Sequence, residues 1–347
     1  MAAPSTLLGG DAYVPILRCK QAELGALTEI DAAALDRLLP LVELRDPSRQ
    51  GKALAAAWPH TDAAVLVHPL NLDERDPDWC AAVRELFAEL REMGVVAVPV
   101  ATTGDAAELL AVVRDAVAAA GAGACVRIEG AALGRVARGS VAGYLRTLTR
   151  ALGVTKAECD LVVDLGLVRT TCTARVIAAE AALSVVPTPT AWRNVVVAFS
   201  AFPGSVMDVA PTTSVATVDR EDALAFAQLV AGALDRSPTY GDYALAAPDD
   251  ADVTWPPVPV VSYAAGDRWH LHRADTRTNR RDQYVALCRD VVSSAHFAGA
   301  DASPGDEYLA DVAGGRVDPG GSLDYAQAST SRHLACVLER LARLGVP

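Results

Sequence analysis

Short, unbroken runs of apolar residues alternate with segments of helical periodicity along most of the chain. In one of them Leu161, Val162 and Val163 are followed by Asp164 and then by Gly166. A parallel strand that is covered on both faces is apolar throughout, and a charge at its carboxyl end marks where it meets water. Similar runs predict further strands at 13–17, 39–44, 64–69, 95–99, 124–129 and 194–200.

Most of the segments between these runs have apolar residues at helical spacing. In the segment 79–93 the side chains of Val83, Leu86, Phe87 and Leu90 share one face, and Gly94 marks the end of the helix. Asp219 is expected to cap another helix, with Asp222 in the capping-box position. The predicted helices, besides 79–93, are 23–38, 105–121, 140–152, 173–184, 219–234, 283–294 and 331–344.

Eight strand–helix repeats of this length favour a TIM-like (β/α)8 barrel. Parallel strands need helical crossovers, and closure of the barrel removes exposed sheet edges. An open doubly wound sheet is the alternative, and the lack of a glycine-rich phosphate loop after any strand counts against it. The eighth strand is assigned to 258–263, with 241–244 as the alternative, and 269–273 is expected to form a short hairpin extension.

This fold class divides the chain into three parts. We expect a flexible arm over residues 1–12, the barrel over 13–298, and a C-terminal extension over 299–347 that packs on the barrel. The extension contains a segment rich in Gly, Pro and Asp, 299–324, before its last helix, and we therefore expect it to be rich in loops.

Composition excludes several classes of protein. Apolar residues make up 51% and charged residues 21% of the 347 residues, as in ordinary globular proteins. A net charge of −12 excludes a broad nucleic-acid surface or an anionic-membrane surface. The seven cysteines form no C-x-x-C pair, which indicates buried, reduced thiols. Residues 1–10 do not resemble a signal peptide and no apolar run is long enough to span a membrane, so we expect a cytoplasmic protein.

The carboxyl ends of barrel strands meet at one mouth, where the active sites of this fold lie. Lys20, Glu43 and Asp164 are the catalytic candidates there, as acid, base or nucleophile. The simpler interpretation is that such residues are solvated or pair with one another, as Lys20 would with Glu43. The candidates for binding a small anion at this mouth are His68, Arg127, Glu129, Ser200 and Tyr263, with Thr102 beside them.

Glu43, Glu129 and Asp164 also offer oxygen ligands to Mg²⁺ or a similar divalent cation. Their spacing does not require a metal, so the cofactor stays open. His270 and His272 would point to one face of a strand, as metal-binding pairs do. No set of further histidines follows them, and we expect two packed imidazoles.

Two other groups of polar residues have simple structural interpretations. Arg273, Arg277, Arg280 and Arg281 form a basic run, which is either a contact for phosphate or carboxylate or a solvated loop. A Ser-His-Asp triad is not supported, because no G-x-S-x-G nucleophile elbow is present.

Several phrases resemble the family named after the beta protein of bacteriophage T4. The first two are YVPILRCKQAE at 13–23 and LPLVEL at 39–44. The later ones are GDYA at 241–244, VSY at 261–263, Trp269 with Arg273, Gln283-Tyr284, SPGD at 303–306 and Arg332-His333. The resemblance extends over essentially the whole chain.

The resemblance implies no particular reaction. Members occur in phages and bacteria, which implies a role in phage–host conflict by association only. Where the family has paired histidines, this chain has Arg332-His333, which counts against a two-histidine device. The polar residues that align with the family's phrases are Lys20, Glu23, Glu43, Asp242, Tyr243, Tyr263, Arg273, Asp306 and His333, so Asp242, Tyr243 and Arg273 join the ligand-binding candidates.

Two functional hypotheses follow. The first is a protein, and in its stronger form a hydrolase or other phosphoester-acting enzyme, that binds a small anionic ligand such as a nucleotide at the barrel mouth. The second is a non-catalytic interaction module that binds a partner protein through its C-terminal region.

Overall fold

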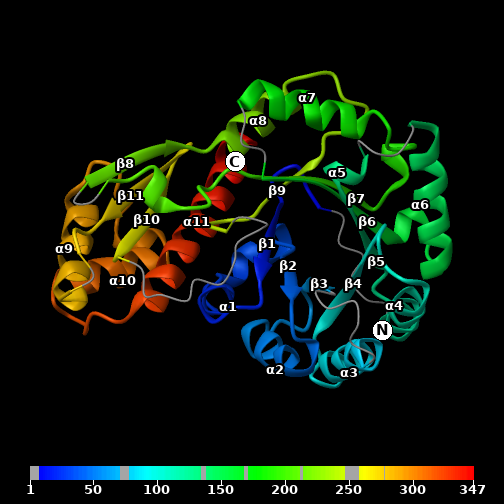
Figure 1. Ribbon diagram of the computed structural model, residues 1–347, viewed down its shortest axis with the longest axis horizontal. Helices are drawn as coiled ribbons and strands as arrows, with labels where there is room; N and C mark the ends of the chain where they lie inside the picture. The colour runs from blue at the N-terminus through cyan, green and yellow to red at the C-terminus, as the bar shows by residue number, and fades with distance from the viewer. Residues whose placement is uncertain are drawn as a thin grey trace.

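Eight parallel strands close into a barrel in the computed structural model, which describes residues 8–70, 78–133, 138–167, 171–211, 214–246, 258–276 and 278–347. The ring and the helices around it are visible in Figure 1. The TIM-like barrel predicted from the sequence is confirmed, and the open doubly wound sheet is excluded. The strands, in their order around the barrel, are β1 (Tyr13–Arg18), β2 (Leu41–Leu44), β3 (Ala64–Pro69), β4 (Val96–Thr102), β5 (Ala124–Glu129), β6 (Cys159–Leu167), β7 (Asn194–Ser200) and β9 (Thr239–Asp242).

The assignment of the eighth strand to 258–263 is wrong. The alternative segment supplies the strand: β9 pairs with β7 on one side and with β1 on the other, and so closes the barrel. Its sequence, TYGD, is short and polar and lacks the apolar run that marks the other strands. Gly241 is needed there, because a Cβ at this position would lie 3.0 Å from the carbonyl oxygen of Val14.

Helices follow most of the barrel strands and cover the outside of the ring. The helix predicted over 23–38 is in fact two helices, because the 3₁₀ helix Ala32–Arg37 has its own cap, in which the side chain of Asp31 accepts the N–H of Ala33. The α-helices of the ring are α1 (Gln21–Thr28), α2 (Pro47–Ala57), α3 (Trp79–Glu92), α4 (Ala107–Ala120), α5 (Gly130–Leu133), α6 (Arg138–Leu152), α7 (Cys172–Leu183) and α8 (Glu221–Val230).

A second, antiparallel sheet of three strands lies beside the barrel (Figure 1). Its strands are β8 (Ser214–Asp219), β10 (Val260–Ala265) and β11 (Arg268–Arg273), in the order β10-β11-β8. Asp219 therefore ends a strand and does not cap α8, whose cap position is occupied by Arg220. Tyr263, which was placed at the barrel mouth, belongs to this sheet.

The C-terminal region contains more helix than its composition indicates. Within the segment 299–324, Pro304 starts α10 (Pro304–Ala313), and the side chain of Ser303 caps it by accepting the N–H of Asp306. The last helix, α11 (Ser322–Leu344), begins nine residues before the predicted start at 331. α11 and α9 (Arg280–Ser293) pack on β10, and α10 packs against both of these helices.

The helix α11 also completes the wall of the barrel. It packs against α1 and β1, and its apolar side chains Leu334, Val337, Leu338 and Leu341 join the core between the strands and the outer helices. A second core fills the barrel interior, with Val14, Ile16, Leu66, Val98, Val162 and Val196 among its members.

Three further observations concern the N-terminal segment, the cysteines and the length of the helices. Residues 1–7 of the predicted arm lie outside the described residues, and Leu8 donates its backbone N–H to Asn194 Oδ1 at 2.9 Å. All seven cysteines are free thiols. In the described ranges no helix has both the length and the hydropathy needed to cross a membrane.

Candidate functional site

A buried cluster of polar side chains occupies the barrel interior at the carboxyl ends of the strands. Alternate residues of each strand point inward, and the last inward residues here are charged or polar. Arg127 lies at the centre of this Arg127 cluster, within hydrogen-bond distance of Glu43, His68, Asp164 and Tyr243.

The guanidinium of Arg127 has a partner at each nitrogen. Its Nη1 donates to Glu43 Oε1 at 2.7 Å and to His68 Nδ1 at 2.8 Å. Its Nε and Nη2 donate to Asp164 Oδ2 at 2.9 and 2.7 Å, and Nη2 also donates to the Tyr243 hydroxyl at 2.6 Å. The Tyr243 hydroxyl in turn donates to Asp164 Oδ2 at 2.6 Å.

Burial and charge set the protonation states of the Arg127 cluster. Burial disfavours the charged form of Arg127, but Asp164, Tyr243 and Glu43 outweigh burial and raise its pKa well above the usual value. Burial and the nearby Arg127 lower the pKa of His68, which is therefore neutral at pH 7 and accepts through Nδ1. Burial and Asp164 raise the pKa of Tyr243. Arg127 thus pairs with two carboxylates at once, so each charge has a partner of opposite sign while the cluster as a whole keeps a net charge of −1.

A cleft of about 710 Å³ lies between the rim of the barrel mouth and the C-terminal region. Its barrel side is formed by Lys20 and Glu23, which follow β1, and by Phe202 and Val206, which follow β7. The other side is formed by residues of β10, β11, α9 and α11, including Val260, Arg273, Tyr284 and Leu323. This volume is typical of small-molecule sites.

Arg273 is a buried cation in the wall of this cleft. Its side chain is 9% exposed, and its Nη1 donates to the carbonyl oxygen of Ala210 at 2.7 Å. Among the described residues its Nε has no hydrogen-bond partner, and it forms no ion pair with any carboxylate. The buried Arg127, Arg193, Arg220 and Arg332 each lie close to at least one carboxylate. Arg175 resembles Arg273, because it is buried, its Nη1 donates to the carbonyl oxygen of Ser200 at 2.8 Å, and its Nε has no partner among the described residues, but it does not line the cleft.

Glu23 also lines the cleft. It was not among the catalytic or ligand-binding candidates, because these were chosen at the ends of predicted strands. It lies in the first turn of α1, and its Oε2 accepts the backbone N–H of Arg18. Burial raises its pKa to about 7, although the hydrogen bond from Arg18 and the charges of Arg18 and Lys20 act in the opposite direction. The sequence offered a signal in the aligned family phrase at 13–23, which contains Glu23.

The other residues placed at the mouth do not line the cleft and form no hydrogen bond with the Arg127 cluster, although Thr102 and Glu129 pair in register with Arg127 and Asp164 on the neighbouring strands. Glu129 is exposed at the end of β5, and Thr102 donates to Asp105 Oδ1 at 2.8 Å. Ser200 is buried and donates to the carbonyl oxygen of Ala246 at 3.3 Å. Glu129 is exposed whereas Glu43 and Asp164 are buried, and these three carboxylates do not form a group that could hold a metal ion.

Asp242 belongs to a buried network outside the barrel, between the wall and the C-terminal region. Its carboxylate accepts from the Tyr13 hydroxyl at 2.5 Å and lies 2.9 Å from His333 Nε2. Arg220 Nη2 lies 3.6 Å from the same carboxylate, and the Arg220 guanidinium faces the ring of Trp269. Each of these side chains is almost fully buried, which indicates that the network joins β9, α8, α11 and the small sheet.

Tyr263 and Asp306 form another internal connection, within the C-terminal region. The Tyr263 hydroxyl donates to Asp306 Oδ1 at 2.6 Å, and Arg332 Nη1 donates to Asp306 Oδ2 at 3.3 Å. Ser303 Oγ donates to the same oxygen at 2.7 Å. Both residues thus have their polar atoms occupied by the fold.

His270 and His272 pack with a third histidine, His296. The rings of His270 and His296 are stacked with centroids 3.7 Å apart, and the Nε2 atoms of His272 and His296 are 3.1 Å apart. In the parts of the chain that are described, no group of three or more His, Cys, Asp or Glu residues has a geometry that could hold a metal ion.

The basic run of arginines does not form one surface. Arg273 faces the cleft, whereas Arg281 is exposed and pairs with Asp318 at 3.1 Å. Arg277 lies outside the described residues.

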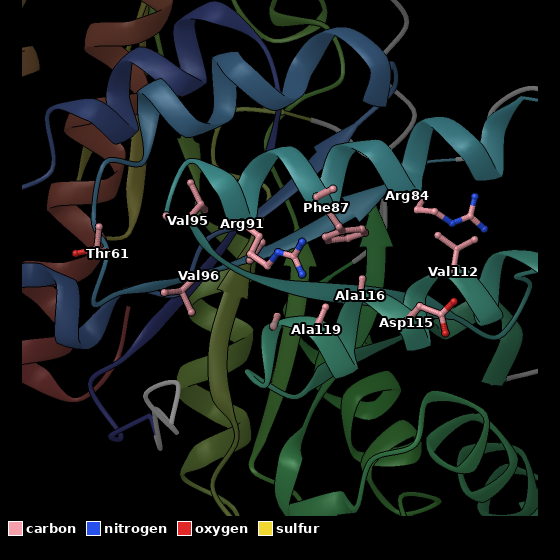
Figure 2. Close-up of a pocket in the computed structure, with 14 residues that line it drawn as sticks. Thr61, Arg84, Phe87, Arg91, Val95, Val96, Val112, Asp115, Ala116 and Ala119 are labelled. Carbon is pink, nitrogen blue, oxygen red and sulfur yellow. The ribbon is translucent and has the colours of Figure 1, made fainter. Parts of the chain in front are cut away.

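A further hollow, of about 400 Å³, lies on the outside of the barrel between α3 and α4 (Figure 2). Phe87, Val112 and Ala116 form its apolar walls, and Arg91 lies along it. It reaches Val96 at the amino end of β4, so it is separate from the mouth. Its lining holds no buried unpaired charge that would indicate a ligand.

The comparisons with known proteins come from a family model and from solved structures. The model described as Beta protein matches residues 13–339. A triosephosphate isomerase from Bartonella henselae is 13% identical over 67% of this chain and 92% of its own, with a TM-score of 0.36. A putative fructose-1,6-biphosphate aldolase from Coccidioides immitis is 11% identical over 95% and 90%, also with a TM-score of 0.36. No curated protein matches the chain.

Proposed function

The chain belongs to the Beta protein family, and from that premise we propose that it binds a small anionic ligand in the cleft between the barrel mouth and the C-terminal region. The ligand class is a nucleotide or another phosphoester. Lys20 and Arg273 supply the positive charge, and the apolar wall around Phe202, Val206 and Tyr284 contacts the rest of the molecule.

The unpaired burial of Arg273 is the observation that supports this proposal best. A buried charge without a counter-charge is costly, and proteins normally pair it or hydrogen-bond all of its donors. Arg273 has a free Nε and no carboxylate partner among the described residues, and it lines a cavity of ligand size. An anion in the cleft would supply the missing counter-charge, because a guanidinium offers paired donors to phosphate or carboxylate.

The proposal is tested by a thermal-shift screen of inorganic phosphate, nucleotides, sugar phosphates and divalent ions. A ligand at one hundred times its dissociation constant stabilises the folded protein by about 2.7 kcal/mol. The variant Arg273→Met should lose this response and keep, or even raise, the melting temperature of the ligand-free protein, since an uncompensated buried charge is removed. The control Arg281→Met, at an exposed arginine, should respond like the wild type.

Two outcomes would contradict the proposal. The first is that none of these anions stabilises the wild-type protein. The second is that an anion stabilises Arg273→Met as much as the wild type, which would place the ligand elsewhere.

Turnover of the bound phosphoester is a further part of the proposal. Glu43 and Asp164 are held by Arg127, so we assign them to shaping the mouth and propose Lys20 and Glu23 as the groups that would face a reacting ligand. Release of inorganic phosphate from a nucleotide that binds would support hydrolysis. If the nucleotide stays bound for hours and no phosphate is released, the protein binds the ligand without hydrolysing it.

The second proposal is a partner protein that binds beside the C-terminal region, at the edge strand β8 of the small sheet on which the C-terminal helices pack. It is favoured by exposed apolar side chains on and just before β8: Met207 is 62% exposed, Val209 39% and Val215 50%. Deletion of residues 299–347 cannot test it, because α11 forms part of the barrel wall. Met207 also lines the cleft, so the test changes the other two side chains: Val209→Glu with Val215→Glu should release a co-purified partner and change phage plating in the native host.

A further inference from the structure

The small sheet has a second edge strand besides β8, and this strand lies at the cleft. β10 pairs with β11 on one side only, and α11 packs beside it (Figure 1). Val260 and Ser262 of β10, and Val258 just before it, are among the residues that line the cleft. An edge strand presents backbone N–H and C=O groups that no neighbouring strand satisfies.

The backbone groups of Val260 point away from β11. In an antiparallel pair, alternate residues exchange both of their backbone hydrogen bonds with the partner strand, and the residues between them direct the same groups outward. Ser262 is one of the outward residues, because its N–H donates to Ser329 Oγ at 3.3 Å. Ala264 is another, because its carbonyl oxygen accepts from Arg332 Nε at 3.0 Å. Val260 lies two residues before Ser262, so its N–H and C=O point to the same side.

These two groups of Val260 form a free donor and a free acceptor at the cleft. The residue before it fits the alternation, since the carbonyl oxygen of Pro259 accepts the N–H of Ala274 in β11's extension at 2.9 Å. Among the described residues neither the outward N–H nor the outward C=O of Val260 has a hydrogen-bond partner. The next outward N–H, that of Ser262, is already used by α11. The free edge is therefore one residue long, which is too short for an added peptide strand.

One donor beside one acceptor is the pattern that a nucleobase can match. The Watson–Crick edge of each base carries a donor next to an acceptor, and proteins recognise bases through such hydrogen bonds. The walls of the cleft suit the flat faces of a base, because Phe202 and Val206 on one side and Tyr284 and Leu323 on the other are apolar. A base between apolar walls gives up its hydrogen bonds to water, so its edge needs partners from the protein.

Arg273 is the cross-strand neighbour of Val260, so a cation lies next to this free edge. The side chain of Arg273 lines the same cleft, and its Nε has no partner among the described residues. Neighbouring strands lie about 4.8 Å apart, so a group that pairs with the outer edge of β10 lies roughly 10 Å from the backbone of Arg273. A mononucleotide can span the distance between these two points, whereas inorganic phosphate cannot.

We propose, resting on the proposed function, that the ligand is a nucleoside monophosphate whose base hydrogen-bonds to the backbone of Val260 and whose phosphate binds Arg273. The N–H of Val260 donates to a ring nitrogen or carbonyl oxygen of the base, and the C=O of Val260 accepts from the N–H beside that atom. No covalent bond of the ligand changes. Arg273 then accounts for the requirement for an anion, and β10 accounts for the preference for a nucleotide over a sugar phosphate.

Calorimetric titration of the wild-type protein tests the ligand class. The probes are AMP, GMP, CMP and UMP, with ribose 5-phosphate and inorganic phosphate for comparison. At least one nucleotide should bind about tenfold more tightly than ribose 5-phosphate, because its base adds hydrogen bonds and apolar contact. If none of the four binds more tightly than ribose 5-phosphate, the inference is wrong while anion binding stands.

Val260→Pro tests the strand edge, because it removes the N–H donor and leaves the charge of the cleft unchanged. Proline is tolerated in an edge strand where the N–H points away from the sheet. Val260→Ala trims the same side chain and keeps the donor, so it is the matched reference. Val260→Pro should bind the preferred nucleotide about tenfold more weakly than Val260→Ala does, and the two variants should not differ in their affinity for ribose 5-phosphate. Equal nucleotide affinities of the two variants would overturn the assignment of the base to β10.

A modified base makes the same test on the wild-type protein, so a poorly folded Val260→Pro does not remove it. Methylation of the base edge, as in N6,N6-dimethyl-AMP for adenine or 3-methyl-UMP for uracil, removes the donor that the C=O of Val260 accepts. It should weaken binding about tenfold, and an unchanged affinity would contradict the inference. If the wild-type protein binds neither the nucleotides nor the two simpler phosphates, the proposed function fails and the inference fails with it.

Discussion

Replacement of Arg127 by methionine should destabilise the protein strongly, because the side chain is buried and pairs with two buried carboxylates. Arg127 is 6% exposed, and it balances Glu43 and Asp164, which are 6% and 3% exposed. The variant Arg127→Met keeps much of the apolar volume but leaves two carboxylates close together without a cation. Removal of one member of a buried ion pair typically costs about 3–5 kcal/mol.

The expected change in melting temperature follows from the size of the chain. Unfolding entropy is about 2.1 cal/mol/K per residue, which for 347 residues amounts to about 0.7 kcal/mol/K. A loss of about 3–5 kcal/mol then lowers the melting temperature by roughly 4–7 °C. Differential scanning calorimetry measures this shift, and Arg114→Met is the control. Arg114 is about half exposed beside Asp115, and an exposed pair contributes no more than about 1 kcal/mol.

A triple variant separates lost charge balance from lost packing. Arg127→Met combined with Glu43→Gln and Asp164→Asn removes the cation and both anions with little change of shape. It should be more stable than Arg127→Met alone, because replacing a whole buried ionic group is often close to neutral. The reasoning is refuted if Arg127→Met costs less than about 1 kcal/mol, or if the triple variant is less stable than the single one.

Three further predictions concern other parts of the fold. Burial opposes ionisation of Asp242, but His333 and Arg220 outweigh burial and hold its pKa well below the usual range. The ionised Asp242 therefore contributes to stability above about pH 4, and this contribution is lost as the pH falls. In urea unfolding, Asp242→Asn should be less stable than the wild type at pH 7 and should lose less stability than the wild type between about pH 4 and pH 2.5. Burial and the neighbouring His296 lower the pKa of His272 to about 4. The unfolded chain therefore takes up a proton on His272 before the folded protein does, and the free energy of unfolding should fall as the pH drops from about 6.5 to 4. His272→Gln should reduce that fall in the same assay. In the native protein a thiol reagent should label the half-buried Cys80 and Cys172, and the buried thiols should react only after unfolding; fast labelling of all seven would contradict the buried core.

Several polar residues of the barrel mouth could be predicted because the barrel strands have a recognisable sequence pattern. A parallel strand inside this fold is covered on both sides, so it is apolar until its last residues, and a charge there lies at the carboxyl end. Arg127, Asp164 and Glu43 were found in this way, and the structure brings all three together. Their partner Tyr243 came from the family phrase and not from the pattern, since β9 is short and polar.

The residues of the cleft were harder to predict for a physical reason. Lys20 and Glu23 lie beside β1, whereas Arg273 ends a strand of the other sheet, 250 residues later. Whether Arg273 is paired depends on which carboxylates come near it, and spacing along the chain does not contain that information. The same holds for Asp219, where a local capping pattern was overridden by its pairing with Arg268 in the small sheet.

The sequence by itself determined seven of the eight barrel strands, the closed α/β architecture and the set of charges at one end of it, because burial on both faces of a strand imposes a composition that can be read locally. Only the tertiary structure decided that TYGD closes the barrel, that α11 packs against β1 and α1, and that none of the carboxylates in the described ranges pairs with Arg273 in the cleft. These features depend on contacts between segments far apart in the chain. The polar strand β9 is stable because Tyr13, His333 and Arg220 hydrogen-bond or pair with the carboxylate of its Asp242. Whether a buried arginine is paired likewise depends on which carboxylates the fold brings near it.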